Sequence, residues 1–135
     1  MTATMMSRVE IDALMRKLYA ARVRGDLEGV CRLFADHAKF EIASASNGNP
    51  IAVNSNGTGE FRPLLTLLTR TFRISDQAIL SMIIDGQKAA VHWRAEVYSR
   101  ITGSIVPTEF IDIVEVQDGR ISSYLEFFVP RVLTH

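Results

Sequence analysis

The sequence predicts an α+β domain in which helices cover one face of a mainly antiparallel sheet. Three observations predict it: apolar residues with a helical period in the first half, alternation with a period of two from residue 74 onward, and short turns that divide this second half. Consecutive strands joined by such turns form an antiparallel meander. The 135 residues suit one domain, residues 1–135, with its own hydrophobic core.

The chain begins with two helices around a tight break. Apolar residues recur at three- and four-residue steps over residues 8–24, which predicts an amphipathic helix. Gly25 ends that helix and Asp26 caps the next, because glycine tolerates the left-handed conformation and a carboxylate accepts free backbone N–H groups. The helical spacing continues over residues 27–34 and predicts a second short helix, and alternation at residues 39–42 then predicts a strand.

A loop and a third helix precede the meander. Residues 44–57 are rich in Ser, Asn, Gly and Pro, which is typical of a long loop in which residues 51–53 can form a short strand. Apolar spacing from Phe61 to Phe72 predicts the helix, with Pro63 in its first turn because proline has no N–H to donate. The turn signals then separate four expected strands, at residues 74–84, 87–101, 105–117 and 120–129.

Composition and charge exclude several classes of protein. Apolar residues make up 47% and no apolar run approaches the ~20 residues needed to span a bilayer. Fifteen basic and fifteen acidic residues cancel, so we expect neither nucleic acid nor a membrane as a partner. The first residues lack the apolar segment of a secretory signal and the single cysteine forms no internal disulfide, so we expect a cytoplasmic protein. Scattered histidines and the lack of a glycine-rich phosphate or dinucleotide motif predict no metal and no cofactor.

The strand at residues 91–100 carries its polar side chains on one face. Alternation places His92, Arg94, Glu96, Tyr98 and Arg100 together, opposite a mainly apolar face. A solvated outer face is the default in antiparallel sheets. The same side chains could instead line a site, and the sequence leaves both interpretations open.

Two acids occupy apolar faces of the following strands. Asp112 stands alone among apolar neighbours, and Glu126 lies between aromatic residues. Partial desolvation raises the pKa of such a carboxyl group and suits it to general acid or base catalysis. A buried ion pair between Asp112 and Arg94 is an equal alternative. Together with Glu96, these residues could form an acid–base network or an inert salt-bridge ladder.

The sequences Gly-Asp-Leu-Glu-Gly at 25–29, Leu-Phe-Ala-Asp-His-Ala at 33–38, Asp-Gly-Arg-Ile at 118–121 and Glu-Phe-Phe at 126–128 resemble the nuclear transport factor 2-like superfamily, and its SnoaL-like and ketosteroid isomerase-like branch in particular. The resemblance implies a cone-shaped (cystatin-like) fold, in which a curved sheet wraps around helices and encloses an apolar pocket. It also implies a homodimer that pairs through the outer sheet face. The scaffold hosts isomerases, cyclases, epoxide hydrolases, dehydratases and proteins without known activity.

The catalytic positions of the steroid isomerases carry over only in part. Their oxyanion-hole tyrosine and their base correspond to Leu18 and Ile42, which are both apolar in this sequence. Tyr19 lies one position from the first of these and would face differently on a helix. Their second oxyanion-hole acid corresponds to Asp112, in agreement with the pattern of the strand.

The limonene epoxide hydrolase pattern gives a second set. Its acid–arginine–acid residues correspond to Glu96, Arg94 and Glu126. The tyrosine and asparagine that help to hold water in those enzymes correspond to Phe40 and Ile42, which cannot do so.

We therefore expect a SnoaL-like protein that binds a small, largely apolar molecule in a conical pocket and catalyses proton transfer or hydration, as an isomerase, hydratase or epoxide hydrolase-like enzyme. The alternative is a non-catalytic ligand-binding or dimeric assembly module whose polar cluster satisfies buried charges, and the face that carries His92 and Arg94 could instead form the dimer interface. The expected catalytic residues are Asp112, Glu96, Arg94 and Glu126. The expected ligand-binding residues are Tyr19, His92, Tyr98, Phe110, Tyr124 and Phe61.

Overall fold

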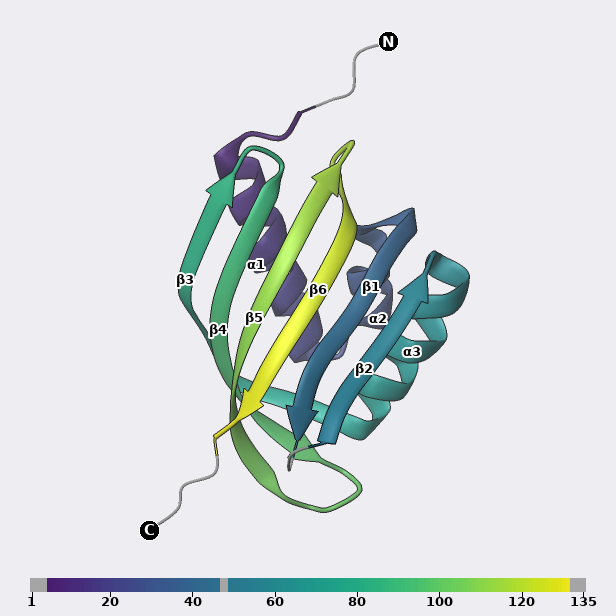
Figure 1. Ribbon diagram of the computed structural model, residues 1–135, viewed down its shortest axis with the longest axis vertical. Coiled ribbons are helices and arrows are strands. Elements are labelled where there is room, and N and C mark those ends of the chain that lie inside the picture. Colours follow the sequence, from purple (N-terminus) through teal and green to yellow (C-terminus); the bar gives the residue numbers. More distant parts are fainter. Residues whose placement is uncertain (1–4, 47–48, 132–135) are drawn as a thin grey trace.

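Helices and strands form two layers, with the helices on the concave face of a curved sheet (Figure 1). The computed structural model describes residues 5–46 and 49–131. In these residues the helices are α1 (Arg8–Arg24), α2 (Leu27–Arg32) and α3 (Thr58–Thr71). The strands are β1 (Phe34–Ser46), β2 (Asn49–Asn56), β3 (Phe72–Asp85), β4 (Lys88–Ser99), β5 (Ile105–Gln117) and β6 (Arg120–Pro130).

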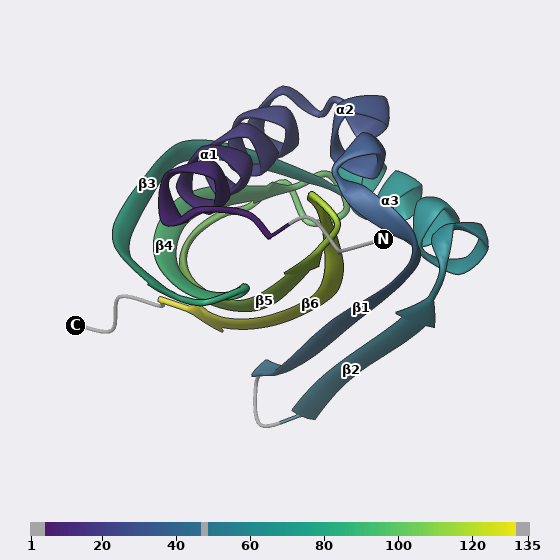
Figure 2. The same ribbon diagram turned by 90° about the horizontal axis from the view of Figure 1, so that it is seen from above.

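The strands form one mixed sheet with the order β2-β1-β6-β5-β4-β3. All neighbouring strands are antiparallel except β1 and β6, which run parallel. Strands β3 to β6 bend around α1, whereas the β1–β2 hairpin extends away from it (Figure 2). The predicted α+β class is confirmed, and so is the antiparallel meander of the second half.

Local signals at the first break place the end of α1 as the sequence predicts. Ser7 and Glu10 form a capping box at the start of this helix, and Gly25 ends it with a φ of 69°. The Asp26 side chain then accepts a hydrogen bond of 3.0 Å from the N–H of Gly29 and caps α2. The last turn of α1 therefore has a defined direction, and this turn carries Arg22.

The main differences from the predicted boundaries lie in the first half of the chain. Helix α2 ends at Arg32, and Phe34 belongs to β1, where it pairs with Ile121 of β6. Pairing with the sheet overrides the helical spacing that placed Phe34 in the helix. Helix α3 begins at Thr58, so Pro63 lies in its second turn, where its ring is exposed. Residues 51–53 belong to β2, in a hairpin with β1 rather than in a long loop.

The two faces of the sheet are distinguished by Trp93 and Arg94. Trp93 is fully buried and stacks on Phe110 at a ring-centroid distance of 3.8 Å, whereas Arg94 is exposed. The face of β4 that carries Trp93 therefore faces the helices, and the face with His92 and Arg94 faces outward. The outer interpretation of the polar face is correct for the four of its residues that belong to β4, whereas Arg100 follows the end of the strand.

Candidate functional site

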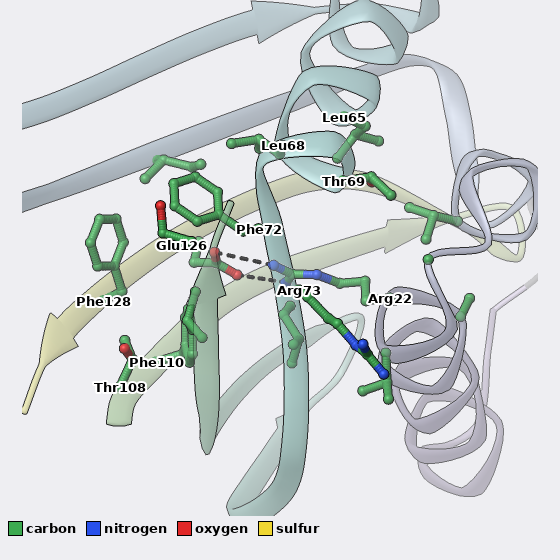
Figure 3. A pocket seen from close by; sticks show the side chains of 18 of the residues that line it. Arg22, Leu65, Leu68, Thr69, Phe72, Arg73, Thr108, Phe110, Glu126 and Phe128 are labelled. Atoms are coloured by element: carbon green, nitrogen blue, oxygen red, sulfur yellow. Dashed lines mark hydrogen bonds and ion pairs between the residues drawn. The ribbon is translucent and has the colours of Figure 1, made fainter. Parts of the chain in front are cut away.

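A cavity of about 1120 Å³ opens at the end of the sheet where α1 and β6 end (Figure 3). Its walls come from the last turn of α1, from α3, and from β1 and β3 to β6. Most of the lining side chains are apolar, among them Leu65, Leu68, Phe72, Phe110 and Phe128. The cavity is open to solvent on one side, so a small molecule can enter without unfolding.

Asp112 lies behind this cavity and is fully buried. One of its oxygens, Oδ2, accepts three hydrogen bonds: from the Tyr19 hydroxyl at 2.7 Å, from the Trp93 indole N–H at 2.7 Å, and from the Tyr124 hydroxyl. The other oxygen, Oδ1, has no hydrogen-bond partner within the described part of the chain. Burial raises the pKa of Asp112 well above its usual range, and the neighbouring Glu126 raises it further. The structure therefore favours a protonated Asp112.

Glu126 is the acidic group that faces the cavity from its floor. It is the cross-strand neighbour of Asp112 and is 3% exposed. Arg22 donates to Glu126 Oε2 from Nη1 at 2.7 Å and to Oε1 from Nη2 at 3.4 Å, as Figure 3 shows. Burial acts against the charged guanidinium, but the nearby acid Glu126 and the other groups around it raise the pKa of Arg22 overall. Arg22 and Glu126 thus form a largely buried ion pair at the cavity wall.

Tyr124 connects the two acids. Its hydroxyl donates to Asp112 Oδ2, lies 3.4 Å from Glu126 Oε2, and accepts a hydrogen bond of 3.0 Å from Arg22 Nη1. Burial raises the pKa of this phenol, so Tyr124 stays a neutral hydroxyl that can donate and accept. The Tyr124 hydroxyl therefore links Asp112 to the cavity-facing Glu126.

The structure brings four of the expected site residues into this buried cluster: Asp112, Glu126, Tyr19 and Tyr124. Tyr19 lies one position from Leu18, which corresponds to the tyrosine of the steroid isomerases, but its hydroxyl still donates a hydrogen bond to Asp112. Phe110 lines the cavity, whereas the buried Phe61 packs on Phe34 and does not line it.

The other expected site residues lie on the outer face of β4. They are His92, Arg94, Glu96 and Tyr98, and they face away from the cavity. His92 lies 3.0 Å from Glu109 on that outer face. The alternative of an ion pair between Asp112 and Arg94 is not formed. Arg94 and Glu96 also do not contact Glu126, because they lie on the outer face of the sheet and Glu126 is buried on the inner face.

Arg22 supplies the guanidinium that the sequence analysis assigned to Arg94. Tyr19 and Arg22 are three residues apart on α1 and therefore share one face of the helix. This spacing was the available signal, since Tyr19 was already expected to be a site residue. The arginine comes from the helix and not from the sheet.

The described residues contain no cluster of His, Cys, Asp or Glu side chains arranged to hold a metal ion. None of the helices in this part of the chain is both long and apolar enough to cross a membrane.

Replacing Arg22 should destabilise the fold, because Glu126 would stay buried without its charged partner. We expect Arg22→Met to lower the free energy of unfolding by about 3 kcal/mol, because the carboxylate loses its charged partner in a buried setting. Arg24→Met is the matched control: Arg24 lies 3.6 Å from the exposed Asp26, so its loss should cost less than about 1 kcal/mol. Urea denaturation at pH 7 measures both values, and equal losses would contradict a special role for the buried pair.

Asp112→Asn should flatten the pH dependence of stability. An unfolded aspartate has a pKa near 3.9, and the folded pKa is raised. The stabilising contribution of this proton is therefore complete below pH ~4 and is lost as the pH rises through the folded pKa. Between these two pKa values, the free energy of unfolding of the wild type should fall by about 1.4 kcal/mol per pH unit relative to that of Asp112→Asn. Urea denaturation from pH 4.5 to 8 tests this, and parallel curves for the two proteins would refute a raised pKa.

Solved structures with a similar fold cover most of the chain. A Bacillus subtilis protein described as a proposed isomerase superposes with a TM-score of 0.77 at 19% identity, over 90% of this chain and 87% of that one. An NTF2-like protein from Burkholderia xenovorans gives 0.75 at 20% identity, over 92% of each chain. An LEH-like epoxide hydrolase of M. tuberculosis gives 0.70 at 16% identity, over 90% of this chain and 84% of that one.

These likenesses establish the NTF2-like fold, and identities at this level do not extend to the reaction. No curated protein matches the sequence. The sequence profile of the SnoaL-like domain matches residues 15–124, which is most of the chain. The resemblance seen in the sequence is thereby confirmed, and the chain belongs to the SnoaL-like domain family.

Proposed function

We propose that this SnoaL-like domain binds a small, largely apolar molecule in its cavity and catalyses a proton transfer on that molecule, or its hydration. One observation carries the proposal. The wall of an apolar cavity carries one buried carboxyl group, that of Glu126, and Tyr124 connects it to a second acid, Asp112, which is fully buried. A cytoplasmic location, expected from the sequence, is part of the same proposal.

The cavity has the properties of a small-molecule site. Ligand sites in proteins measure roughly 300–1,000 Å³ and are mostly apolar with a few polar groups. The volume of about 1120 Å³ suits an occupant with several rings or a long chain. Phe110 and Phe128 offer aromatic surface to it, and the polar groups converge at the floor around Glu126.

Glu126 is the base in this proposal. It takes a proton from a carbon atom next to a carbonyl group of the ligand, and the electrons of the broken C–H bond move toward the carbonyl oxygen. Arg22 lies beside Glu126 and stabilises the charge that develops on that oxygen. Return of the proton to another carbon completes an isomerisation. In a hydration the same base takes a proton from water while the water oxygen bonds to the β-carbon of an α,β-unsaturated carbonyl, the π electrons move toward the carbonyl oxygen, and the proton then returns to the α-carbon.

Asp112 acts through Tyr124, because it is fully buried and cannot touch the ligand. Its carboxyl group is linked to Glu126 by the Tyr124 hydroxyl. Asp112 is therefore a positioning residue, which accepts a hydrogen bond from Tyr124 beside Glu126. The proposal retains Asp112 and Glu126 from the expected catalytic set and uses Arg22 where Arg94 was expected.

The proposed reactions are of the kinds named for two proteins that share the fold. The fold is shared with a proposed isomerase of Bacillus subtilis and with an epoxide hydrolase of M. tuberculosis. Proton transfer is part of an isomerisation, and addition of water is the reaction of a hydrolase, so the two alternatives correspond to the two neighbours.

The rate of hydrogen exchange in a model ketone tests the proposal. We expect the wild type to accelerate the exchange of the C1 protons of 2-tetralone in deuterated buffer, followed by proton NMR. Glu126→Gln should lower the acceleration at least about 100-fold, since it removes the base. Asp112→Asn should shift the pH profile of the rate, which a purely structural role would leave in place. Glu115→Gln, on the outer face of β5, is the control with unchanged rate.

Two results would contradict the proposal. Binding of 2-tetralone without faster exchange would favour the alternative of a non-catalytic binding module, which the apolar Leu18 and Ile42 also favour. A loss of activity in Arg94→Gln and Glu96→Gln, but not in Glu126→Gln, would instead place the chemistry on the outer face of β4.

The outer sheet face supports a homodimer as a further part of the proposal. Apolar side chains on neighbouring strands are exposed there without cover, and we define the outer-face patch as Ile83, Ile111, Ile113 and Phe127. Ile111 and Phe127 are direct cross-strand neighbours, and Ile83 connects to Ile113 through Ala90. Contiguous exposed apolar surface of this kind marks interaction sites, and the same patch on a second copy would cover it with closed symmetry.

Charge placed in the outer-face patch should separate the copies. We expect the wild type to sediment as a dimer at micromolar concentration and Phe127→Glu to sediment as a monomer with unchanged circular dichroism. Leu67→Glu introduces the same charge at an exposed position of α3 and should remain dimeric. A monomeric wild type would refute the dimer.

A further inference from the structure

We infer that the ligand of the cavity is an amphipathic acid: an apolar body that fills the cavity and a carboxylate that pairs with Arg73 and Arg100 at its edge. This inference rests on the proposed function, since it requires that the cavity binds a ligand. It adds the chemical class of that ligand and two residues that select it.

The lining of the cavity carries an excess of positive charge although the whole chain has none. Four arginines and two acidic residues line it, a net of two positive charges, whereas the sequence as a whole is neutral. Both acidic residues already have partners, because Glu126 pairs with Arg22 and Asp26 with Arg24. The charges left over are those of Arg73 and Arg100.

No carboxylate among the described residues lies within ion-pair distance of Arg73 or Arg100. Most of the other cavity-lining charges are paired, so the two free guanidinium groups are an exception at this site. Guanidinium groups match the planar oxygens of a carboxylate with paired hydrogen bonds. An acidic group of the ligand would supply the partner that the chain does not.

The backbones of the two arginines lie close together on one side of the cavity. Arg73 lies near the start of β3, and Arg100 follows the end of β4, its pairing partner. The backbone N–H of Arg100 donates to the carbonyl oxygen of Thr71 at 2.9 Å, which fixes Arg100 two residues from Arg73. Figure 3 shows the Arg73 side chain extending from β3 on the same side as Arg22. Both arginines are exposed, so they mark the solvent side of the cavity.

The walls between this edge and the floor are apolar. Ile74 of β3, Val97 of β4 and Val106 of the neighbouring β5 line the cavity, and Phe72 and Phe128 line it as well. A ligand with its acidic group at the edge would place its apolar body against these side chains. Its reacting carbon would then lie toward Glu126, the acidic group at the floor.

A matched pair of fluorescent probes tests the inference: 11-(dansylamino)undecanoic acid and its methyl ester, which differ only in the carboxylate. We expect the wild type to bind the acid roughly tenfold more tightly than the ester at low salt. The double variant Arg73→Gln/Arg100→Gln should bind both probes with similar affinity. Its affinity for the acid should be lower than that of the wild type, and its affinity for the ester should be unchanged. Higher sodium chloride should reduce the advantage of the acid, because exposed charges are screened.

Two controls locate the effect. Arg70→Gln removes the same charge from an exposed position near the end of α3 that does not line the cavity, and it should preserve the preference for the acid. Val106→Trp fills part of the cavity and should weaken the binding of both probes. If Val106→Trp weakens neither, the probes bind elsewhere and the inference is wrong.

The outcomes separate this inference from the proposed function. Equal affinity of the wild type for acid and ester, or a preference that survives in the double variant, would overturn the anionic ligand and leave the cavity as a binding site. A wild type that binds neither probe would overturn both.

Discussion

The hydrogen bonds to Asp112 join the helical layer to the sheet. A carboxyl group without access to water is costly unless donors surround it, and the three donors on Oδ2 come from α1, β4 and β6. Tyr19, Trp93 and Tyr124 must therefore keep their relative positions for the fold to tolerate Asp112. Tyr19 and Trp93 also contact each other, at a ring-centroid distance of 5.0 Å, so apolar packing and hydrogen bonding require the same placement of α1.

This placement divides the interior into two parts. On one side of Asp112 the concave space is filled by apolar side chains such as Ile11, Met15 and Val91, all fully buried. On the other side α1 ends at Gly25, and the space beyond Arg22 is the cavity. The polar cluster lies at this boundary, where one acid is enclosed and its cross-strand neighbour faces an opening. Two carboxyl groups on adjacent strands thereby acquire different environments, which is the usual way in which a protein separates the roles of an acid and a base.

The sequence predicted the fold well because its signals are local. The capping residues around Gly25 and the alternation of β4 to β6 depend on near neighbours, and these elements are where the pattern places them. Phe34 was assigned wrongly because pairing with β6, far along the chain, decides its structure. Asp112 was found because a lone acid in an apolar row is visible without a structure. Arg22 was missed because helical spacing shows which residues share a face but not which strand that face meets.

The asymmetry of the hydrogen bonds around Asp112 bears on its protonation. A carboxylate spreads its charge over both oxygens, and an unpartnered buried charge costs far more than an unpartnered neutral group. The three donors at Oδ2 favour the charged form, but Oδ1 has no donor within the described residues, and burial together with the neighbouring Glu126 raises the pKa of Asp112 overall, so the neutral acid is favoured. Arg22 is then left to balance Glu126 alone, and the pair is neutral as a unit. Replacement of the whole cluster by apolar side chains would cost little stability on these grounds. On the proposal of a catalytic site, chemistry at the cavity floor is the reason that the cluster is kept.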